Sequence, residues 1–257
     1  MHAPRARRRA ASSVRHAPSL HAHVRLRGWS LLVSVSVAIC ILVALLAIVG
    51  WIASLHTNVT TYSYSGAITH VRLRLASGDA TIVSSPSAAV EVRRTDRYAF
   101  GHAARERRSF AAGIVSVSSS CPRIILGSCS ASYEVAVPET ATVEVRTGDG
   151  NVRLDGFRGS ANVRTGSGSV AAAAYCGFDL SAVSGSGDLQ VATACAPRHL
   201  LLHTGSGNAS ALVPPGRYRV DASGARRRVG GVTPDAGAPF TLDLHSGSGT
   251  VTIGGGL

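Results

Sequence analysis

Residues 163–170 read Val-Arg-Thr-Gly-Ser-Gly-Ser-Val, and this stretch decides the fold because the chain repeats it. Close copies occupy residues 145–152, 182–189, 202–209 and 244–251, and looser copies occupy 75–82 and 220–227. The first Gly of four successive copies recurs every 18 to 20 residues, at Gly148, Gly166, Gly185 and Gly205. A period of this length, with the same turn chemistry in each copy, predicts stacked supersecondary units.

Each copy reads as a strand, a Gly-x-Gly turn and a second strand. Apolar and polar residues alternate on both sides of the turn, which is the period of a strand with one inward face. The inward column before the turn holds Val145, Val163, Ala182, Leu202 and Leu244. The column after the second Gly holds short polar residues, which we expect to hydrogen-bond neighbouring turns: Asp79, Asn151, Ser169, Asp188, Asn208 and Thr250. The glycines that permit the turn are Gly148, Gly150, Gly166, Gly168, Gly185, Gly187, Gly205, Gly207, Gly247 and Gly249.

Equal columns favour an all-β fold, a β-solenoid (β-helix-like) repeat domain in which each rung contacts only its neighbours. A meander or sandwich of antiparallel hairpins is the rival architecture, because two short strands per unit could also pair with each other. We expect the rungs to stack in sequence order, which places His203 and His245 two rungs apart. The copy around Gly224 carries Arg226 in place of the second Gly, so this rung either bulges outward or shifts its register.

Four cysteines fall within the repeat region and the segment before it. Cys176 lies ten residues after Gly166, and Cys195 lies ten after Gly185, so both occupy one position on consecutive rungs. Neighbouring strands are about 4.8 Å apart, which suits a disulfide. Cys121 and Cys129 flank a short stretch and would close a loop. We therefore predict the pairs Cys176–Cys195 and Cys121–Cys129, in an oxidising compartment.

A 28-residue run without charge, residues 28–55, predicts one transmembrane α-helix before the repeat domain. Trp29 and Trp51 lie near its two ends, where aromatic residues favour the membrane interface. The run is longer than the core of a signal peptide, so we expect an uncleaved anchor. Seven Arg precede the run, which predicts a cytoplasmic N-terminus and an extracellular C-terminal domain in the plasma membrane.

The net charge of +12 belongs mostly to that N-terminal tail. All 26 basic residues are Arg, and seven of them precede Gly28. From Ser54 onward 19 Arg face 14 Asp and Glu, a net of +5, which is an ordinary surface. With 5% aromatic residues the domain has few side chains on which bases could stack, so we expect no nucleic-acid partner. The cluster Arg226, Arg227 and Arg228 could contact an anionic polymer of the cell envelope.

The pattern of strands and turns also resembles a known family. Val135-Ala-Val-Pro138, the strand and turn at 143–152, the Cys121–Cys129 segment and Gly216-Arg-Tyr-Arg-Val220 are similar to the "putative adhesin" family of bacterial surface proteins. The resemblance covers about residues 60–255. It implies a domain of β-strand repeats on the cell surface, whose function in the family is not defined, and it carries over no catalytic residue.

Signs of catalysis and of cofactor or metal binding are missing from the sequence. The Gly-Ser-Gly copies lack a consistent acid and base, and a chain without Lys has no phosphate-binding P-loop lysine. His199 and His203 would lie on one strand face about 13 Å apart, too far to chelate. A calcium repeat would need an Asp every nine residues, whereas Asp149 and Asp188 are 39 apart. We therefore expect no enzyme, no cofactor and no metal.

The sequence thus divides into a tail at 1–27, an anchor at 28–55, a β region with a Cys loop at 56–140 and the Gly-x-Gly repeats at 141–257. Residues 60–140 and the repeats are expected to form one extracellular domain. We predict a membrane-anchored, adhesin-like binding or spacer module whose partners are envelope polymers or surface proteins. The alternative hypothesis is an accessory protein of envelope-stress sensing or signalling. The sequence leaves the oligomeric state open.

Overall fold

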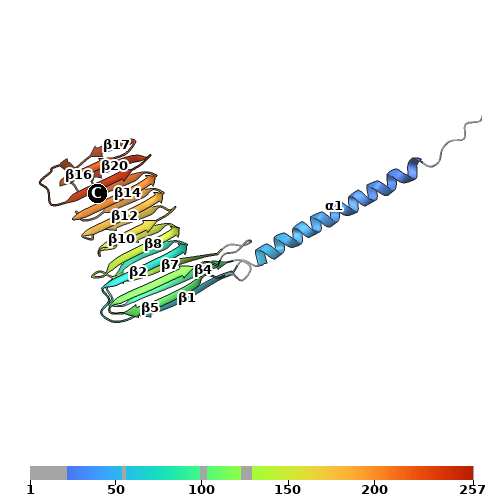
Figure 1. Cartoon of the computed structure of the whole chain (residues 1–257), viewed down its shortest axis with the longest axis horizontal. Helices are drawn as coiled ribbons and strands as arrows, with labels where there is room; N and C mark the ends of the chain where they lie inside the picture. Colours follow the sequence, from blue (N-terminus) through green and yellow to red (C-terminus); the bar gives the residue numbers. More distant parts are fainter. Residues whose placement is uncertain (1–21, 54–55, 99–102, 123–128, 257) are drawn as a thin grey trace, which may run out of the picture. The chain divides into compact units, whose positions relative to one another are not determined.

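The chain is mainly β-structure with one apolar helix near its N-terminus (Figure 1). The computed structural model describes residues 22–53, 56–98, 103–122 and 129–256. The chain divides into two compact units, and the division falls between Ile52 and Ala53.

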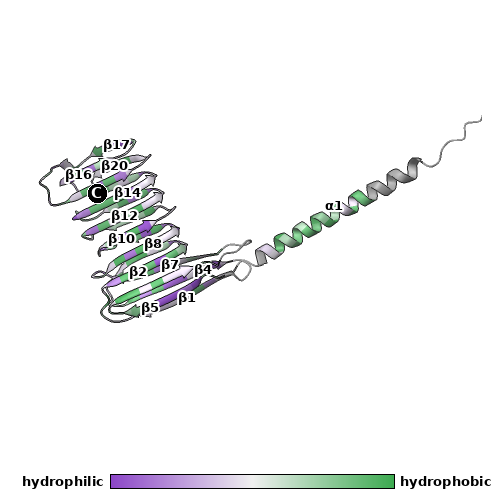
Figure 2. Cartoon of the chain, in the orientation of Figure 1, coloured by the Kyte–Doolittle hydropathy of each residue, from purple (hydrophilic) through white to green (hydrophobic). Residues whose placement is uncertain are grey.

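The first unit contains the helix α1 (Ala22–Ala53). Within it, Leu32–Trp51 forms a stretch of 20 residues with a mean hydropathy of 3.1, long and apolar enough to cross a membrane. Figure 2 shows this stretch as the most continuous apolar segment of α1. The helix begins before the predicted segment 28–55, because Arg and Leu are good helix formers and extend it toward the N-terminus.

The second unit consists of two ten-stranded sheets. The first sheet has the order β1 (His56–Tyr64), β4 (Val90–Tyr98), β7 (Cys129–Pro138), β3 (Ala80–Ser85), β9 (Val152–Asp155), β11 (Val170–Tyr175), β13 (Leu189–Thr193), β15 (Ala209–Val213), β20 (Thr250–Gly255) and β17 (Arg226–Gly230). The second has the order β18 (Thr233–Pro234), β16 (Arg217–Ser223), β19 (Thr241–Ser246), β14 (His199–Ser206), β12 (Asp179–Ser186), β10 (Ala161–Thr165), β8 (Thr142–Asp149), β2 (His70–Ser77), β6 (Ile114–Ser120) and β5 (Arg105–Ala111).

Each Gly-x-Gly repeat contributes one strand to each sheet. Strands before the turn pair in parallel in the second sheet, as in Val145↔Val163↔Ala182, and strands after it pair in parallel in the first. The antiparallel hairpin arrangement is therefore wrong for the repeats, because a strand pairs with its copy in the next repeat and not with its own partner across the turn. Antiparallel pairing occurs at one end of each sheet, in β1–β4–β7 and β5–β6.

The stacking order departs from the sequence order at both ends. The C-terminal repeat, β19 and β20, lies between β14–β15 and β16–β17, and β2–β3 lies between β6–β7 and β8–β9. The prediction that His203 and His245 are two rungs apart is therefore wrong: they pair directly, with ring centroids 6.0 Å apart.

The composition of the β16–β17 repeat explains why it lies at the end. Arg227 pairs with the buried Val251, a register position that is apolar in the other repeats, so this repeat cannot cover an apolar rung on both sides. The C-terminal repeat has apolar residues at the inward positions of both its strands, and it lies in the interior of the stack. Terminal repeats of stacked folds need a polar outer side. Of the two alternatives for the copy around Gly224, the structure has the register shift. Before the turn Val220 pairs with Leu242, and after it Arg227 pairs with Val251, so the offset between the two repeats changes across the turn.

A single apolar core lies between the two sheets. The predicted inward columns are fully buried: Val145, Val163, Ala182, Leu202 and Leu244 before the turn, and Val152, Val170, Leu189, Ala209 and Val251 after it, are each 0–1% exposed. Because burial alternates strictly along these strands, every second residue of each sheet faces outward, and the outward residues form straight rows across the repeats.

Candidate functional surface

Backbone contact between successive turns requires the turn glycines. A Cβ on Gly168 would lie 2.0 Å from the carbonyl oxygen of Gly150, and one on Gly187 would lie 2.1 Å from that of Gly168. The Ser or Thr before each turn donates to the Gly carbonyl of the neighbouring rung, as Ser184 Oγ does to Gly168 O at 2.9 Å. These glycines therefore serve packing, and they build the edge of the stack.

The short polar column after each turn forms a continuous hydrogen-bonded ladder. Each side-chain oxygen accepts a hydrogen bond from the backbone N–H one rung further on. The distances are 2.8 Å for Asp79 and Asn151, 3.0 Å for Asn151 and Ser169, 3.3 Å for Ser169 and Asp188, 2.7 Å for Asp188 and Asn208, and 2.9 Å for Asn208 and Thr250. This is the role predicted from the sequence. Because these oxygens are used within the fold, the column offers little to a ligand.

The cysteines lie in the predicted pairs at disulfide distance. Cys176 and Cys195 have Cα atoms 4.8 Å apart, the spacing of neighbouring rungs, and Cys121 and Cys129 have Cα atoms 5.8 Å apart. Residues 123–128 between the second pair lie outside the described residues. Cys40 of α1 is a free cysteine.

Arg226, Arg227 and Arg228 lie on β17, the last strand of the first sheet, and all three are exposed. Charged side chains on an edge strand hinder pairing with another chain. Edge protection therefore explains this cluster without a ligand.

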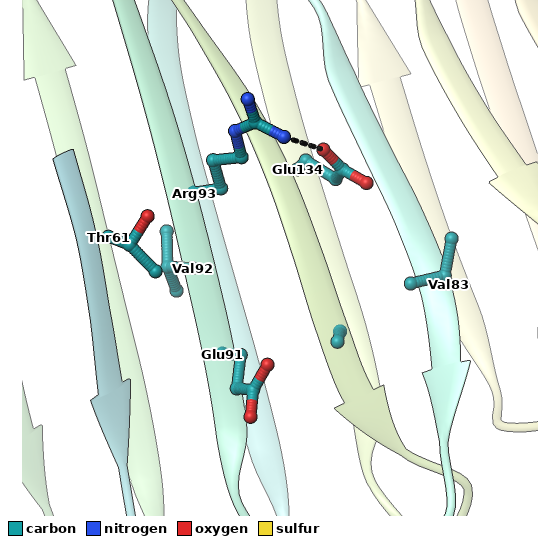
Figure 3. A pocket seen from close by; sticks show the side chains of 7 residues that line it. Thr61, Val83, Glu91, Val92, Arg93 and Glu134 are labelled. Atoms are coloured by element: carbon teal, nitrogen blue, oxygen red, sulfur yellow. Dashed lines mark ion pairs between the residues drawn. The ribbon is translucent and has the colours of Figure 1, made fainter. Parts of the chain in front are cut away.

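Several surface hollows lie over the two sheets, and two of them, one on each sheet, differ in charge. A hollow of about 200 Å³ on the first sheet is lined by Thr61, Val83, Glu91, Arg93 and Glu134, among others (Figure 3). Arg93 Nη1 lies 4.0 Å from Glu134 Oε2, so the charges of these two residues balance. The carboxylate of Glu91 then gives the lining a net negative charge.

One hollow on the second sheet, of about 260 Å³, is basic. Its lining includes Arg72, Arg146, Arg164 and Glu144. Glu144 pairs with Arg146 at 2.8 Å and with Arg72 at 3.4 Å, whereas Arg164 has no ion pair within the described residues, so the three guanidinium groups of the lining face a single carboxylate. Its outward, exposed position and net positive charge suit an anionic ligand.

A second polar group lies near the other end of this sheet. Asp221, Asp243 and His245 offer ligand atoms within 4.8 Å of one another. His245 Nε2 lies 2.6 Å from Asp243 Oδ1, and its Nδ1 is hydrogen-bonded to Ser223 Oγ. Both ring nitrogens of His245 are therefore engaged within the protein. The sequence predicted neither a metal site nor this group. Its residues come from two consecutive repeats, but the pairs Asp221↔Asp243 and Ser223↔His245 depend on a register that the irregular copy around Gly224 does not reveal.

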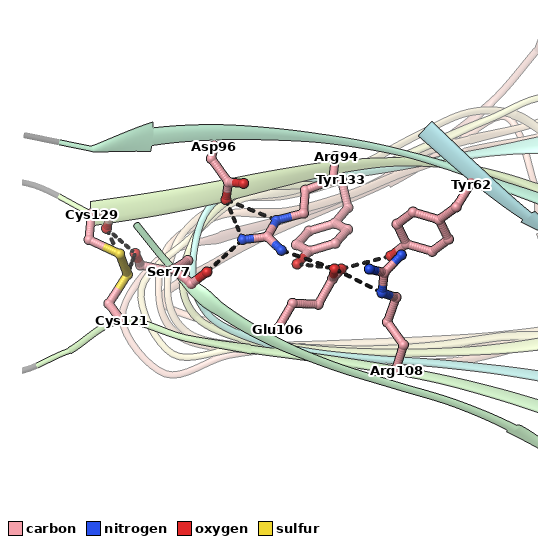
Figure 4. Close-up of polar contacts among 10 residues, drawn as sticks. Tyr62, Ser77, Arg94, Asp96, Glu106, Arg108, Cys121, Cys129 and Tyr133 are labelled. Atoms are coloured by element: carbon pink, nitrogen blue, oxygen red, sulfur yellow. Dashed lines mark hydrogen bonds and ion pairs between the residues drawn. A yellow bond between two sulfur atoms is a disulfide. The ribbon is translucent and has the colours of Figure 1, made fainter. Parts of the chain in front are cut away.

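A buried ionic cluster around Glu106 lies between the sheets at the β1–β5 end (Figure 4). Glu106 accepts hydrogen bonds from Tyr62 at 2.7 Å and Tyr133 at 3.1 Å, and Arg94 donates to it at 2.9 Å. Arg108 Nε is 3.2 Å from the same carboxylate. Arg94 also donates to Asp96 at 2.6 and 2.9 Å and to the Ala104 carbonyl at 2.7 Å.

The Glu106 cluster ties together the strands that close this end of the stack. Tyr62 is on β1, Arg94 on β4, Tyr133 on β7 and Glu106 on β5, so one carboxylate connects both sheets. Burial, followed by the Glu106 carboxylate, raises the pKa of both Tyr62 and Tyr133 well above the usual tyrosine value. Both phenols therefore stay protonated and donate to Glu106.

This cluster was not predicted from the sequence, although one signal was present. Residues 90–96 alternate, and the same period of two that buries Val90 and Val92 also buries Arg94 and Asp96. Two opposite charges at consecutive inward positions indicate a buried pair. The cluster is structural in character, since its charges are satisfied within the fold.

Comparison with known proteins gives similar structures but no matching sequence. No family model and no curated protein matches the chain. A solved structure described as a putative cell adhesion protein from Clostridium sporogenes covers 78% of this chain and 100% of its own, at 11% identity and a TM-score of 0.47. A putative adhesin from Bacteroides fragilis covers 76% and 97%, at 11% identity and a TM-score of 0.43. A putative adhesin from Parabacteroides merdae covers 76% and 96%, at 7% identity and a TM-score of 0.35. These names match the family that the sequence resembles.

Proposed function

We propose that the chain is a single-pass membrane protein whose repeat domain is an adhesin-like binding or spacer module on the outer face of the cell membrane. The domain acts through its surface and not through a reaction. The observation that carries this proposal is the set of straight, outward-facing rows on the second sheet, which present side chains at regular intervals above a rigid apolar core.

The repeats in this proposal form a β-solenoid. Parallel pairing of each strand with its copy in the next repeat, alternation between two sheets and hydrogen-bonded turns support it. Such a stack is stiff along its axis because every rung is bonded to both neighbours. Stiffness suits a module that holds a binding surface away from the membrane.

The anchor and its orientation follow from α1 and its flanks. Leu32–Trp51 is apolar over 20 residues, seven Arg precede Gly28, and the next Arg in the chain is Arg72. Basic residues remain on the cytoplasmic side. The two disulfides favour an oxidising compartment for the domain. The tail, residues 1–27, lies largely outside the described residues, and no observation supports a signalling partner for it.

Protease treatment of intact cells that express the full chain tests this proposal. Antibodies against the tail and the domain follow the fragments, and the same cells permeabilised with detergent serve as the control. We expect protease to remove the domain and to leave the tail antigen intact until the membrane is opened. Recovery of the whole chain in the soluble fraction, or a protected domain in intact cells, would contradict the proposal.

A further inference from the structure

The second sheet carries an outward row that crosses seven strands and consists mostly of basic side chains. In register across neighbouring strands lie Arg107, Ser118, Arg74, Arg146, Arg164, Val183 and His203. All four arginines are exposed, and none of the seven residues is acidic. We name this set the basic row.

Three arginines occupy directly neighbouring positions in the basic row. Arg74, Arg146 and Arg164 pair across β2, β8 and β10, at the strand spacing of about 4.8 Å. Like charges directly opposite each other on neighbouring strands are destabilising. Within the described residues Arg146 pairs with Glu144, whereas Arg74 and Arg164 have no ion pair. An anion bound along the row would relieve this repulsion.

The basic hollow of the second sheet lies beside this part of the row. Arg146 and Arg164 line it together with Arg72, and Asn162 and Thr142 add neutral polar groups. A guanidinium group binds phosphate or carboxylate through two parallel hydrogen bonds. The spacing of the arginines is regular and the row is straight, so a linear ligand with repeated anionic groups fits it better than a single small anion.

We propose that the basic row, centred on Arg74, Arg146 and Arg164, binds a linear anionic polymer that carries repeated phosphate or carboxylate groups. This inference rests on the proposed function, because an envelope polymer meets the domain only outside the membrane. The polymer lies along the axis of the stack, with successive anionic groups on successive rungs.

Polymer binding by the full chain in detergent tests this inference, with long-chain polyphosphate and polygalacturonate as separate probes for the two anionic groups. The triple variant Arg74→Gln, Arg146→Gln and Arg164→Gln is expected to bind about a hundredfold more weakly, since each Arg near an anionic surface contributes roughly fivefold. The matched control, Arg226→Gln, Arg227→Gln and Arg228→Gln, removes the same charge and should bind within about threefold of the parent. Inorganic phosphate and monomeric galacturonate should bind far more weakly than either polymer.

A variant that strengthens binding separates a ligand site from a structural role. Glu144→Gln removes the carboxylate that competes for Arg72 and Arg146, so polymer affinity should rise about fivefold. Glu134→Gln, on the other sheet, should leave it unchanged. Equal losses in the two triple variants, or no gain from Glu144→Gln in a chain that unfolds like the parent, would overturn the inference. Binding to purified chain does not depend on cellular location, so its failure is distinguishable from failure of the protease experiment.

Discussion

The polar side chains of this domain are of two kinds. Some form hydrogen bonds or ion pairs within the protein, and others point outward to the solvent. The ladder from Asp79 to Thr250 and the Glu106 cluster are engaged with other protein groups. The arginines of the basic row have few such partners. Polar residues of the same type therefore have different roles, and the role follows from register and burial.

The Glu106 carboxylate should be worth several kcal/mol to the stability of the domain. Glu106→Gln removes the charge that balances Arg94 and Arg108, and breaking a buried ion pair costs about 3–5 kcal/mol. Denaturant unfolding of the domain measures this loss. Glu139→Gln, an exposed residue 3.7 Å from Arg158, should change stability by less than about 0.5 kcal/mol. Equal midpoints for the two variants would contradict this account of the cluster.

Stability should fall as the pH rises above about 10. The pKa values of Tyr62, Tyr133 and Tyr175 are raised, with burial as the largest cause, so the folded state holds protons that the unfolded chain releases. The contribution of these phenols is complete below the ordinary tyrosine pKa and is lost above it. Tyr62→Phe should flatten the alkaline slope of the unfolding free energy. An unchanged slope in Tyr62→Phe would refute this assignment.

At the scale of the element, the turn glycines and inward columns were predictable, because the same residue types recur at the same positions in each repeat. In every copy the backbones of neighbouring turns come close together at the position of Gly168, and the side chain at the position of Val163 is buried. The order of the repeats was not predictable in the same way. Columns that match in all copies make every repeat a suitable neighbour for every other, so they do not specify which pair is adjacent. A signal of a terminal repeat was Arg227, which stands in the sequence where the other repeats have an apolar residue.

Substitution of a turn glycine should destabilise the stack strongly. Gly168→Ala would place a Cβ 2.0 Å from the Gly150 carbonyl oxygen, and forcing the rungs apart should cost about 3 kcal/mol. Gly230→Ala is the matched control, because nothing lies within 4 Å of its added Cβ. Thermal unfolding followed by circular dichroism compares the two. If both variants unfolded at the same temperature, the turns would not be packed as described.

For the whole molecule, composition and charge indicated the broad organisation, an apolar segment followed by a β-rich domain. The candidate surface was harder to predict, since the basic row joins residues from seven strands between Arg74 and His203. Arg226, Arg227 and Arg228 are adjacent in sequence and so attracted attention first. The rows became visible only with the register, because strand pairing and not sequence proximity places outward side chains together.

The central claim is that every outward row follows from one register, in which the C-terminal repeat lies inside the stack. Disulfide formation in two double-cysteine variants tests it most directly. Leu201 pairs with Asp243, which pairs in turn with Asp221. Leu201→Cys with Asp243→Cys should form a disulfide under mild oxidation, because neighbouring strands are about 4.8 Å apart. Leu201→Cys with Asp221→Cys should remain reduced, because two strand spacings, about 9.6 Å, exceed the reach of a disulfide. A non-reducing peptide map with the crosslink in the second variant and not in the first would contradict the register and the surface built on it.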